Sequence, residues 1–302
     1  MSSETYASTA VTTAAPAQAK VRKRSRGAQQ QWIWNGVAVL ATLVMIFPIY
    51  WMMNAAFSTN KELFSRTPRL FPAPLSVESF AGILADRAFW SALTMSAGVT
   101  LIVVFVAVIF GFLAAVAVSR FRFRFRGGGL IILLVLIVQM IPAEALFISQ
   151  FRMLDGWGLL NTVAGLSILY VGMIVPFTVW LLRGFIHGIP AELEEAAMID
   201  GCSRTAAFFH VTLPLLGPGI VTASVFSFLH AWNEYTLALI VMTRPGNATL
   251  PLWLQSFSSE LSATDWAGIM AGATLISVPV VILFLIVQGR LAGGMMAGAV
   301  KG

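Results

Sequence analysis

Few side chains in this sequence could bind a ligand or move a proton, and several of them lie in long apolar runs. A carboxylate inside a membrane span costs at least about 2.5 kcal/mol, so Glu144 and Glu234 are candidates for function. Amides and carboxylates pair with the hydroxyl groups of a polar solute such as a sugar, and Trp180 or Trp232 could supply an aromatic face for it. The candidates for such a polar path are Gln139, Glu144, Trp180, Asn233, Glu234 and Tyr235. Alternatively, both acids simply reach the headgroup region, because each lies near the outer end of its run.

The histidines and the cysteine do not form a catalytic or metal-binding pattern. His187, His210 and His230 are spread along the chain and do not cluster with acids, so we predict no catalytic residue and no metal site. His230 lies one helical turn before Glu234, which favours a satisfied polar pair over a proton relay. Cys202 is the only cysteine, which excludes an intrachain disulfide.

A polar segment, residues 188–214, separates two apolar runs. Pro190 suits the first turn of a helix, where its missing N–H costs nothing. Gly201 can take a left-handed conformation and end that helix. Ser203 is then a suitable N-cap for a second helix, which Pro214 ends. The segment is predicted to form two short helices joined by a sharp turn.

The acids of this segment allow two interpretations. Glu192, Glu194 and Glu195 lie near the first turn, where each stabilises the helix by about 0.3–1 kcal/mol through its dipole. This alone explains them in an amphipathic hairpin at the membrane surface. A helix that binds lipid, however, carries Lys and Arg on its polar face. Acids beside the small residues Ala196 and Ala197 suit close packing against a basic protein partner instead.

The elements that hold these residues are strongly apolar. The chain has 302 residues, of which 58% are hydrophobic and 11% charged, against about 25% charged in soluble domains. Roughly 20 helical residues cross the hydrocarbon core. Six runs reach that length, so we predict an all-α polytopic membrane protein with six transmembrane helices. The runs cover residues 32–53, 90–118, 129–149, 163–186, 216–242 and 266–288.

The basic residues set the expected orientation. With the N-terminus inside, 13 of the 19 Lys and Arg residues lie on inner segments, which predicts that both termini are cytoplasmic. The net charge of +6 does not indicate nucleic-acid binding, because the basic residues lie between apolar runs rather than on one polar face. We predict a disordered, basic cytoplasmic tail over residues 1–31, a membrane domain over 32–288 and a cytoplasmic tail over 289–302.

The polar segment also matches a known signature. Its pattern is Glu-Ala-Ala, three residues, Gly, nine residues, Ile or Val, one residue and Leu-Pro, and the matching residues are Glu195, Ala196, Ala197, Gly201, Val211, Leu213 and Pro214. This pattern resembles the signature loop of binding-protein-dependent ABC importer permeases, with Val211 in place of Ile. Further segments look like the smaller subunit of maltose-type sugar permeases, namely residues 120–127, 159–162, 180–185, 231–234 and 297–302. The resemblance covers roughly residues 30–302.

That resemblance implies that residues 188–214 hold the coupling helix, which docks on a separate ATPase. It implies that Glu195 pairs with a basic residue of the ATPase, that Gly201 sets the turn and that the two alanines permit close packing. The residues placed in this contact are Glu195, Ala196, Ala197, Asp200, Gly201, Leu213 and Pro214. The family's C-terminal tail approaches the ATPase dimer, so Gly298 and Lys301 are a second candidate contact.

The chain has no GxxxxGK[ST] phosphate loop, so we expect ATP and Mg²⁺ to bind to partner ATPases. In this chain we predict neither an enzymatic activity nor a cofactor. The resemblance implies an importer of a di- or oligosaccharide, or of a related solute of the glycerol-phosphate type. Its partners would be a second permease, two ATPases and an external binding protein, in the inner (plasma) membrane of a prokaryote. One alternative is an ion-coupled secondary transporter or channel, which needs more carboxylates near mid-membrane. The other is a membrane enzyme, which needs clustered His and acids.

Overall fold

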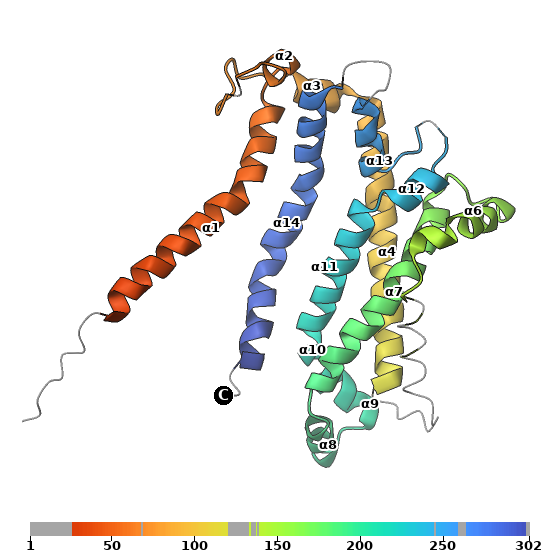
Figure 1. Cartoon of the computed structure of the whole chain (residues 1–302). Helices are drawn as coiled ribbons and strands as arrows, with labels where there is room; N and C mark the ends of the chain where they lie inside the picture. Colours follow the sequence, from red (N-terminus) through yellow and green to blue (C-terminus); the bar gives the residue numbers. More distant parts are fainter. Residues whose placement is uncertain are drawn as a thin grey trace, which may run out of the picture. The chain divides into compact units, whose positions relative to one another are not determined.

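The computed structural model describes residues 26–67, 69–119, 133, 137, 139–244, 246–258 and 264–299, and of these the side chains of 26–30 and 290–299 are not described. Residues 1–25, the stretch 120–126 and Lys301 therefore lie outside it. The chain divides into two compact units, residues 1–50 and 51–302, and helix α1 (Arg26–Ala56) extends across the division. Every regular element in the described ranges is helical, which confirms the all-α class (Figure 1).

Four single helices in the described ranges are long and apolar enough to cross a membrane, and a bent pair could form a fifth span. The four are α1, α4 (Arg87–Ser119), α7 (Val163–Gly188) and α14 (Trp266–Ala299). They match the predicted runs 32–53, 90–118, 163–186 and 266–288. The last helix continues through most of the predicted C-terminal tail, 289–302, since α14 ends only at Ala299.

Two of the six predicted runs differ from the structure. The fifth, 216–242, is not one helix: α11 (Gly217–Asn233) ends at Asn233, and a separate helix α12 (Thr236–Val241) follows. The third, 129–149, is described only at residues 133, 137 and 139–149. Its described end holds a turn, then the 3₁₀ helix η1 (Ala143–Leu146) and the start of α6 (Phe147–Gly156). Pro142 precedes η1 and has no N–H to continue a helix, which explains the interruption.

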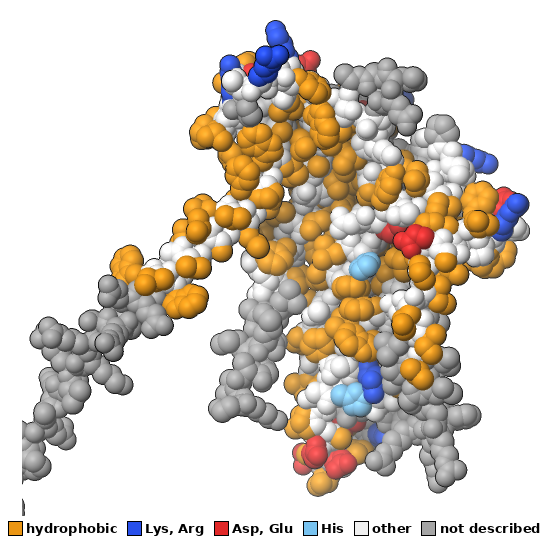
Figure 2. Space-filling model, in the orientation of Figure 1, with side chains coloured by type: hydrophobic (Ala, Val, Ile, Leu, Met, Phe, Trp, Pro, Cys, Tyr) orange, Lys and Arg blue, Asp and Glu red, His pale blue; other side chains and the backbone are white. Residues whose placement is uncertain are grey.

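Within residues 51–302, the helices α4, α7, α11 and α14 lie side by side (Figure 1). At one end, which we call the α2 end, lie α2 (Asn60–Leu63), α3 (Glu78–Ala85) and α13 (Leu250–Leu254). At the other, the α8 end, lie α8 (Glu192–Ile199) and α9 (Arg204–Ala207). Figure 2 shows hydrophobic side chains over the middle of the helices and charged side chains mainly towards the two ends. This distribution suits a body embedded in a bilayer.

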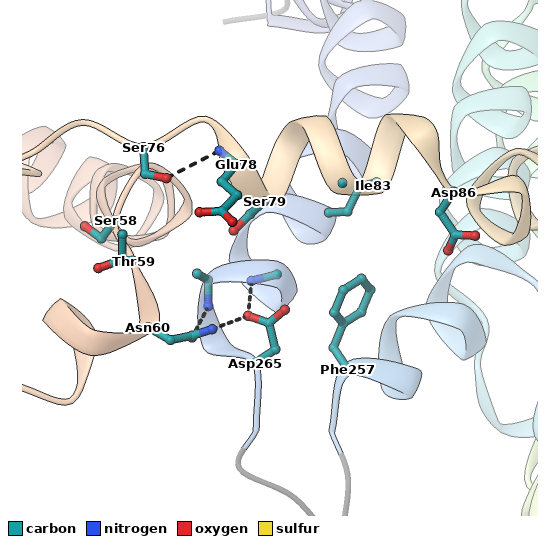
Figure 3. Close-up of a pocket in the computed structure, with 13 residues that line it drawn as sticks. Ser58, Thr59, Asn60, Ser76, Glu78, Ser79, Ile83, Asp86, Phe257 and Asp265 are labelled. Atoms are coloured by element: carbon teal, nitrogen blue, oxygen red, sulfur yellow. Dashed lines mark hydrogen bonds between the residues drawn. The ribbon is translucent and has the colours of Figure 1, made fainter.

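Side-chain amides and carboxylates tie the α2 end together. Asn60 donates to the Asp265 carboxylate at 2.6 Å and accepts from the N–H of Ala267 at 3.0 Å. Asp265 also accepts from the N–H of Gly268 at 2.8 Å, so it caps the start of α14 (Figure 3). A hollow of about 380 Å³ opens beside these hydrogen bonds and is partly lined by Glu78 and Asp86. The segment between α1 and α4 thus contains two short helices and is fixed to the start of α14 through Asn60.

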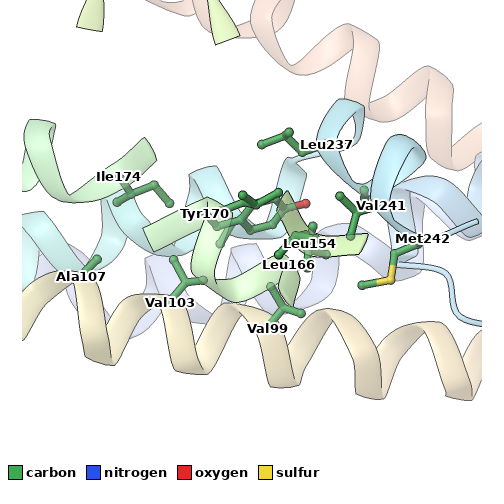
Figure 4. Packing of buried hydrophobic residues seen from close by; sticks show 13 residues of the cluster. Val99, Val103, Ala107, Leu154, Leu166, Tyr170, Ile174, Leu237, Val241 and Met242 are labelled. Carbon is green, nitrogen blue, oxygen red and sulfur yellow. The ribbon is translucent and has the colours of Figure 1, made fainter. Parts of the chain in front are cut away.

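The main core lies between α4 and α7. Val99, Val103 and Ala107 recur every four residues along α4, and all three are buried. They face Tyr170 and Ile174 of α7 (Figure 4). Side chains four residues apart share one helix face, so this spacing produces a straight apolar seam.

The same seam continues to a glycine that sets the distance between the two helices. A Cβ atom on Gly111 would lie 2.5 Å from Cγ2 of Thr178, which is closer than any real contact. Glycine therefore permits the close approach of α4 and α7 at this level.

Candidate functional site

The polar segment forms a helical hairpin, residues 188–215, which we call the α8 hairpin. Its first helix, α8, begins at Glu192, two residues after the predicted start at Pro190. Ala191 precedes it and provides no side-chain cap. The first turn instead carries Glu192, Glu194 and Glu195, whose negative charges stabilise the exposed N–H groups of that turn.

The turn after α8 follows the prediction. Gly201 has a φ of +96°, the left-handed region that favours glycine. Its N–H donates to the carbonyl of Met198 at 3.1 Å, and the N–H of Cys202 donates to the carbonyl of Ala197 at 3.0 Å. This pair of bonds is the Schellman motif, which satisfies the last carbonyl groups of a helix. The turn directs the chain back towards the membrane helices.

Replacing Gly201 by alanine tests this turn. A Cβ atom there would meet nothing within 4 Å, so only the left-handed backbone opposes it. That conformation costs other residues about 1–2 kcal/mol, and amide hydrogen exchange in α8 should become roughly 5- to 30-fold faster. Gly188→Ala is the matched control, because its Cβ atom also meets nothing and its φ is not positive. Equal exchange rates in both variants would contradict the prediction.

The return arm of the hairpin is less regular than predicted. Ser203 is the N-cap of α9, as expected, since its hydroxyl accepts from the N–H of Ala206 at 3.2 Å. The expected second helix extends over Arg204–Leu215, one residue past Pro214, but it is not uniformly α-helical. A π-helical turn, η2 (Phe208–Thr212), follows α9, and the short helix α10 (Leu213–Leu215) follows η2. The segment Arg204–Leu215 meets α11 at an angle of 60°.

A hydrogen bond joins the two arms of the hairpin. The hydroxyl of Thr212, which is completely buried, donates to the carboxylate of Glu194. Glu194 is half-buried and faces the return arm, whereas its neighbour Glu195 is exposed. The two acids thus differ in role, although both lie in the first turn. We call this bond the hairpin clasp.

The end of the hairpin presents an exposed surface, which we call the α8 tip (Leu193, Glu195, Ala196, Ile199 and Asp200). Ile199 is 86% exposed and Leu193 is 43% exposed. Figure 2 shows acidic side chains gathered over α8 at this end. The tip therefore combines apolar groups with negative charge.

The other residues of the predicted coupling contact lie around the tip. Ala197 is half-buried in α8, and Gly201 is exposed in the turn. Leu213 and Pro214 lie at the base of the hairpin in α10, where Leu213 is half-buried and Pro214 exposed. Sequence reasoning did not include Ile199 in the contact, although its place at the end of α8 beside Asp200 was the available signal. Gly298 lies at the end of α14, where side chains are not described.

The residues of the predicted polar path do not form one group. Gln139 lines a hollow of about 560 Å³ between η1, α6 and α7, together with Gln150. Glu144 is exposed on η1. Trp180 lines a different hollow, of about 630 Å³, near the α8 end. Asn233 is exposed at the end of α11.

Glu234 occupies the break between α11 and α12. Its carboxylate accepts from the N–H of Leu237 at 2.8 Å and from the N–H of Ala238 at 3.2 Å. It also accepts from the hydroxyl of Tyr170, which is completely buried in the core. The carboxylate thus caps α12 and fixes it to α7, which is why the predicted fifth span is interrupted here.

Two aromatic residues that neighbour Glu234 in sequence also have partners within the subunit. The hydroxyl of Tyr235 donates to the side-chain oxygen of Gln255. Trp232 is buried, and its ring N–H donates to the carbonyl of Ile276 in α14 at 3.1 Å. Trp180, by contrast, is 51% exposed. Within the described ranges, no three His, Cys, Asp or Glu side chains are arranged to hold a metal ion.

Comparison with known proteins identifies the family. Residues 107–296 match the model of the "Binding-protein-dependent transport system inner membrane component" family. The chain is 38% identical over 273 residues to the diacetylchitobiose uptake system permease protein DasC of Streptomyces coelicolor, covering 89% of this chain and 97% of the relative. It is 34% identical to the trehalose transport system permease protein SugB of Mycobacterium tuberculosis, covering 91% and 100%.

A solved structure supports the same fold. One chain of a bacterial ABC transporter that imports the acidic polysaccharide alginate is 22% identical, with a TM-score of 0.73, covering 88% of this chain and 98% of that one. The family match includes the α8 hairpin, α11 and most of α14. The chain belongs to the family of inner membrane components of binding-protein-dependent transport systems.

Proposed function

We propose that this chain is a permease subunit of an ATP-driven importer that carries a disaccharide or oligosaccharide across the inner membrane. The relatives above are named for uptake of diacetylchitobiose and for transport of trehalose, and the structural neighbour imports alginate. These names support a carbohydrate as the solute. The chain would provide the path, and separate subunits would hydrolyse ATP, because it contains no phosphate-binding loop.

The exposed α8 tip is the structural feature that supports this proposal. It would be the docking surface for an ATPase subunit. A largely exposed isoleucine beside Glu195 and Asp200 suits a cleft that is apolar at its floor and basic at its rim. The hairpin clasp and the Schellman turn hold the two arms together before any partner binds. A preformed surface loses less conformational freedom on docking.

The expected orientation of the chain in the membrane places the other subunits. The α8 end would face the cytoplasm, with both termini on that side, as the distribution of Lys and Arg indicates. The α2 end would face the external solute-binding protein. A second permease and two ATPases would complete the complex, and residues 298–301 would provide a second ATPase contact.

An uptake assay tests the proposal. The complete complex is reconstituted in vesicles with its binding protein and supplied with labelled diacetylchitobiose or labelled trehalose. We expect uptake that requires ATP on the α8 side and that continues when ionophores collapse ion gradients. Uptake that follows an ion gradient without ATP would overturn the proposal in favour of an ion-coupled carrier.

A further inference from the structure

Four rings form a continuous series across helices α7 and α11. The centroids of Trp180 and Phe177 lie 5.9 Å apart, and Phe177 stacks on Phe226 with centroids 3.8 Å apart. Phe226 then packs on the ring of His230 at 4.4 Å. Favourable aromatic pairs have centroids about 4.5–7 Å apart. The first of these distances lies in that range, and the other two are shorter, so the rings are in direct contact. We call these four side chains the ring series.

The ring series lies on the surface of the subunit rather than in its core. Trp180 is 51% exposed and His230 is exposed, while Phe177 and Phe226 are half-buried. Phe226, His230 and Asn233 recur at intervals of four and three residues, so they share one face of α11. Phe228 belongs to another face of α11, where it stacks on the buried Trp232 with centroids 5.4 Å apart.

Polar groups lie at both ends of the ring series. At one end, Asn233 is exposed next to the break at Glu234. At the other end, Trp180 lines the hollow of about 630 Å³ together with Arg183 and His187. The Nε atom of Arg183 is buried and has no hydrogen-bond partner among the described residues. A buried guanidinium N–H without an acceptor is costly, so an acceptor atom on a solute, on water or on another subunit would stabilise this position.

A lipid-facing role does not fit this surface. An exposed histidine, an exposed amide and an arginine on the faces of apolar spans would be costly against acyl chains, so such groups line polar cavities or meet other subunits. A sugar has the complementary chemistry, since its C–H faces pack on aromatic rings and its hydroxyl groups pair with amides and guanidinium groups. Rings that follow one another along two helices offer a moving sugar a new apolar face at each step.

We propose that the ring series of Phe177, Trp180, Phe226 and His230 forms a wall of the sugar path, leading to the hollow at Arg183. This inference rests on the proposed function and adds the residues that contact the solute. It assigns Trp180 to the path and excludes Trp232, because Trp232 lies buried against α14. It also assigns Glu234 to the support of the path rather than to its lining, because that carboxylate already has three donors.

The test uses the same reconstituted complex, with labelled diacetylchitobiose or trehalose, whichever the wild type transports. Phe226→Leu should reduce the rate of uptake roughly tenfold through loss of stacking. Phe226→Trp should retain most of the uptake, because it keeps an aromatic face. Phe228→Leu is the matched control on the same helix, and its uptake should stay within about twofold of the wild type if assembly is intact.

Two further measurements separate the alternatives. Trp180→Leu, at a more exposed position, should repeat the loss of uptake while ATP hydrolysis stimulated by the binding protein changes less than about twofold. Normal uptake in Phe226→Leu and Trp180→Leu would overturn the ring series alone. Loss of uptake together with loss of the second permease on purification would show a subunit contact instead. Uptake by the wild type that follows an ion gradient without ATP would overturn the proposed function and the ring series together.

Discussion

Replacing Ile199 by aspartate is expected to reduce ATP-driven uptake at least tenfold and to release the ATPase subunits from the complex. Ile199 is 86% exposed at the α8 tip, so docking would bury nearly its whole side chain. Burial of an isoleucine contributes about 1.5–3 kcal/mol, and about 1.4 kcal/mol corresponds to a tenfold change in affinity. An added carboxylate beside Asp200 would also have to lose its water in the interface. The measurements are copurification of the ATPase and sugar-stimulated ATP hydrolysis.

Ile199→Leu is the control for this prediction. Leucine keeps an apolar side chain of similar volume, so binding and uptake should remain close to the wild type. If the aspartate variant retains both ATPase binding and uptake, the α8 tip is not the docking surface. If both variants lose them equally, the exact shape of the side chain matters rather than its apolar character.

Replacing Glu234 by alanine should lower the stability of the subunit by about 3 kcal/mol, the second large effect. Three donors lose their acceptor at once, and one of them is the hydroxyl of the fully buried Tyr170. A buried donor without a partner costs about 1–3 kcal/mol, and the two N–H groups at the start of α12 lose their cap. The measurement is the thermal unfolding midpoint of the purified complex in detergent.

A pair of tyrosine variants isolates the buried bond. Tyr170→Phe removes the buried donor and should lower the unfolding midpoint clearly, though less than Glu234→Ala does. Tyr235→Phe removes a hydroxyl that bonds to the exposed side chain of Gln255, so water can replace its partner and the midpoint should hardly change. Equal effects of the two tyrosine variants would show that the Glu234 bond does not stabilise the break.

Local rules were sufficient for the features that depend on neighbouring residues. The left-handed turn at Gly201 and the N-cap at Ser203 follow from side chains within a few positions of the backbone that they satisfy. Four of the six spans followed from apolar length alone. In these cases the physical cause lies inside the element itself.

The remaining features depend on contacts between distant residues. The end of α11 at Asn233 depends on Glu234 bonding to Tyr170, which lies 64 positions away. The clasp between Glu194 and Thr212 joins residues 18 positions apart, so the charge–dipole rule for a first helical turn treated Glu194 and Glu195 alike. The order of rings from Trp180 to His230 likewise arises only when α7 and α11 pack together. Apolar periodicity identifies the helices but not the register between them.

The 60° bend before α11 has a mechanical consequence. The clasp closes the hairpin, and the buried Leu216 lies in sequence between α10, which ends the return arm, and α11. A force applied to α8 is therefore expected to move the hairpin as a rigid unit. This motion would rotate α11 about a point near Leu216 instead of separating the two arms of the hairpin. Because α11 also carries Phe226 and His230, a small displacement of α8 would shift those two rings relative to Phe177 and Trp180 on α7.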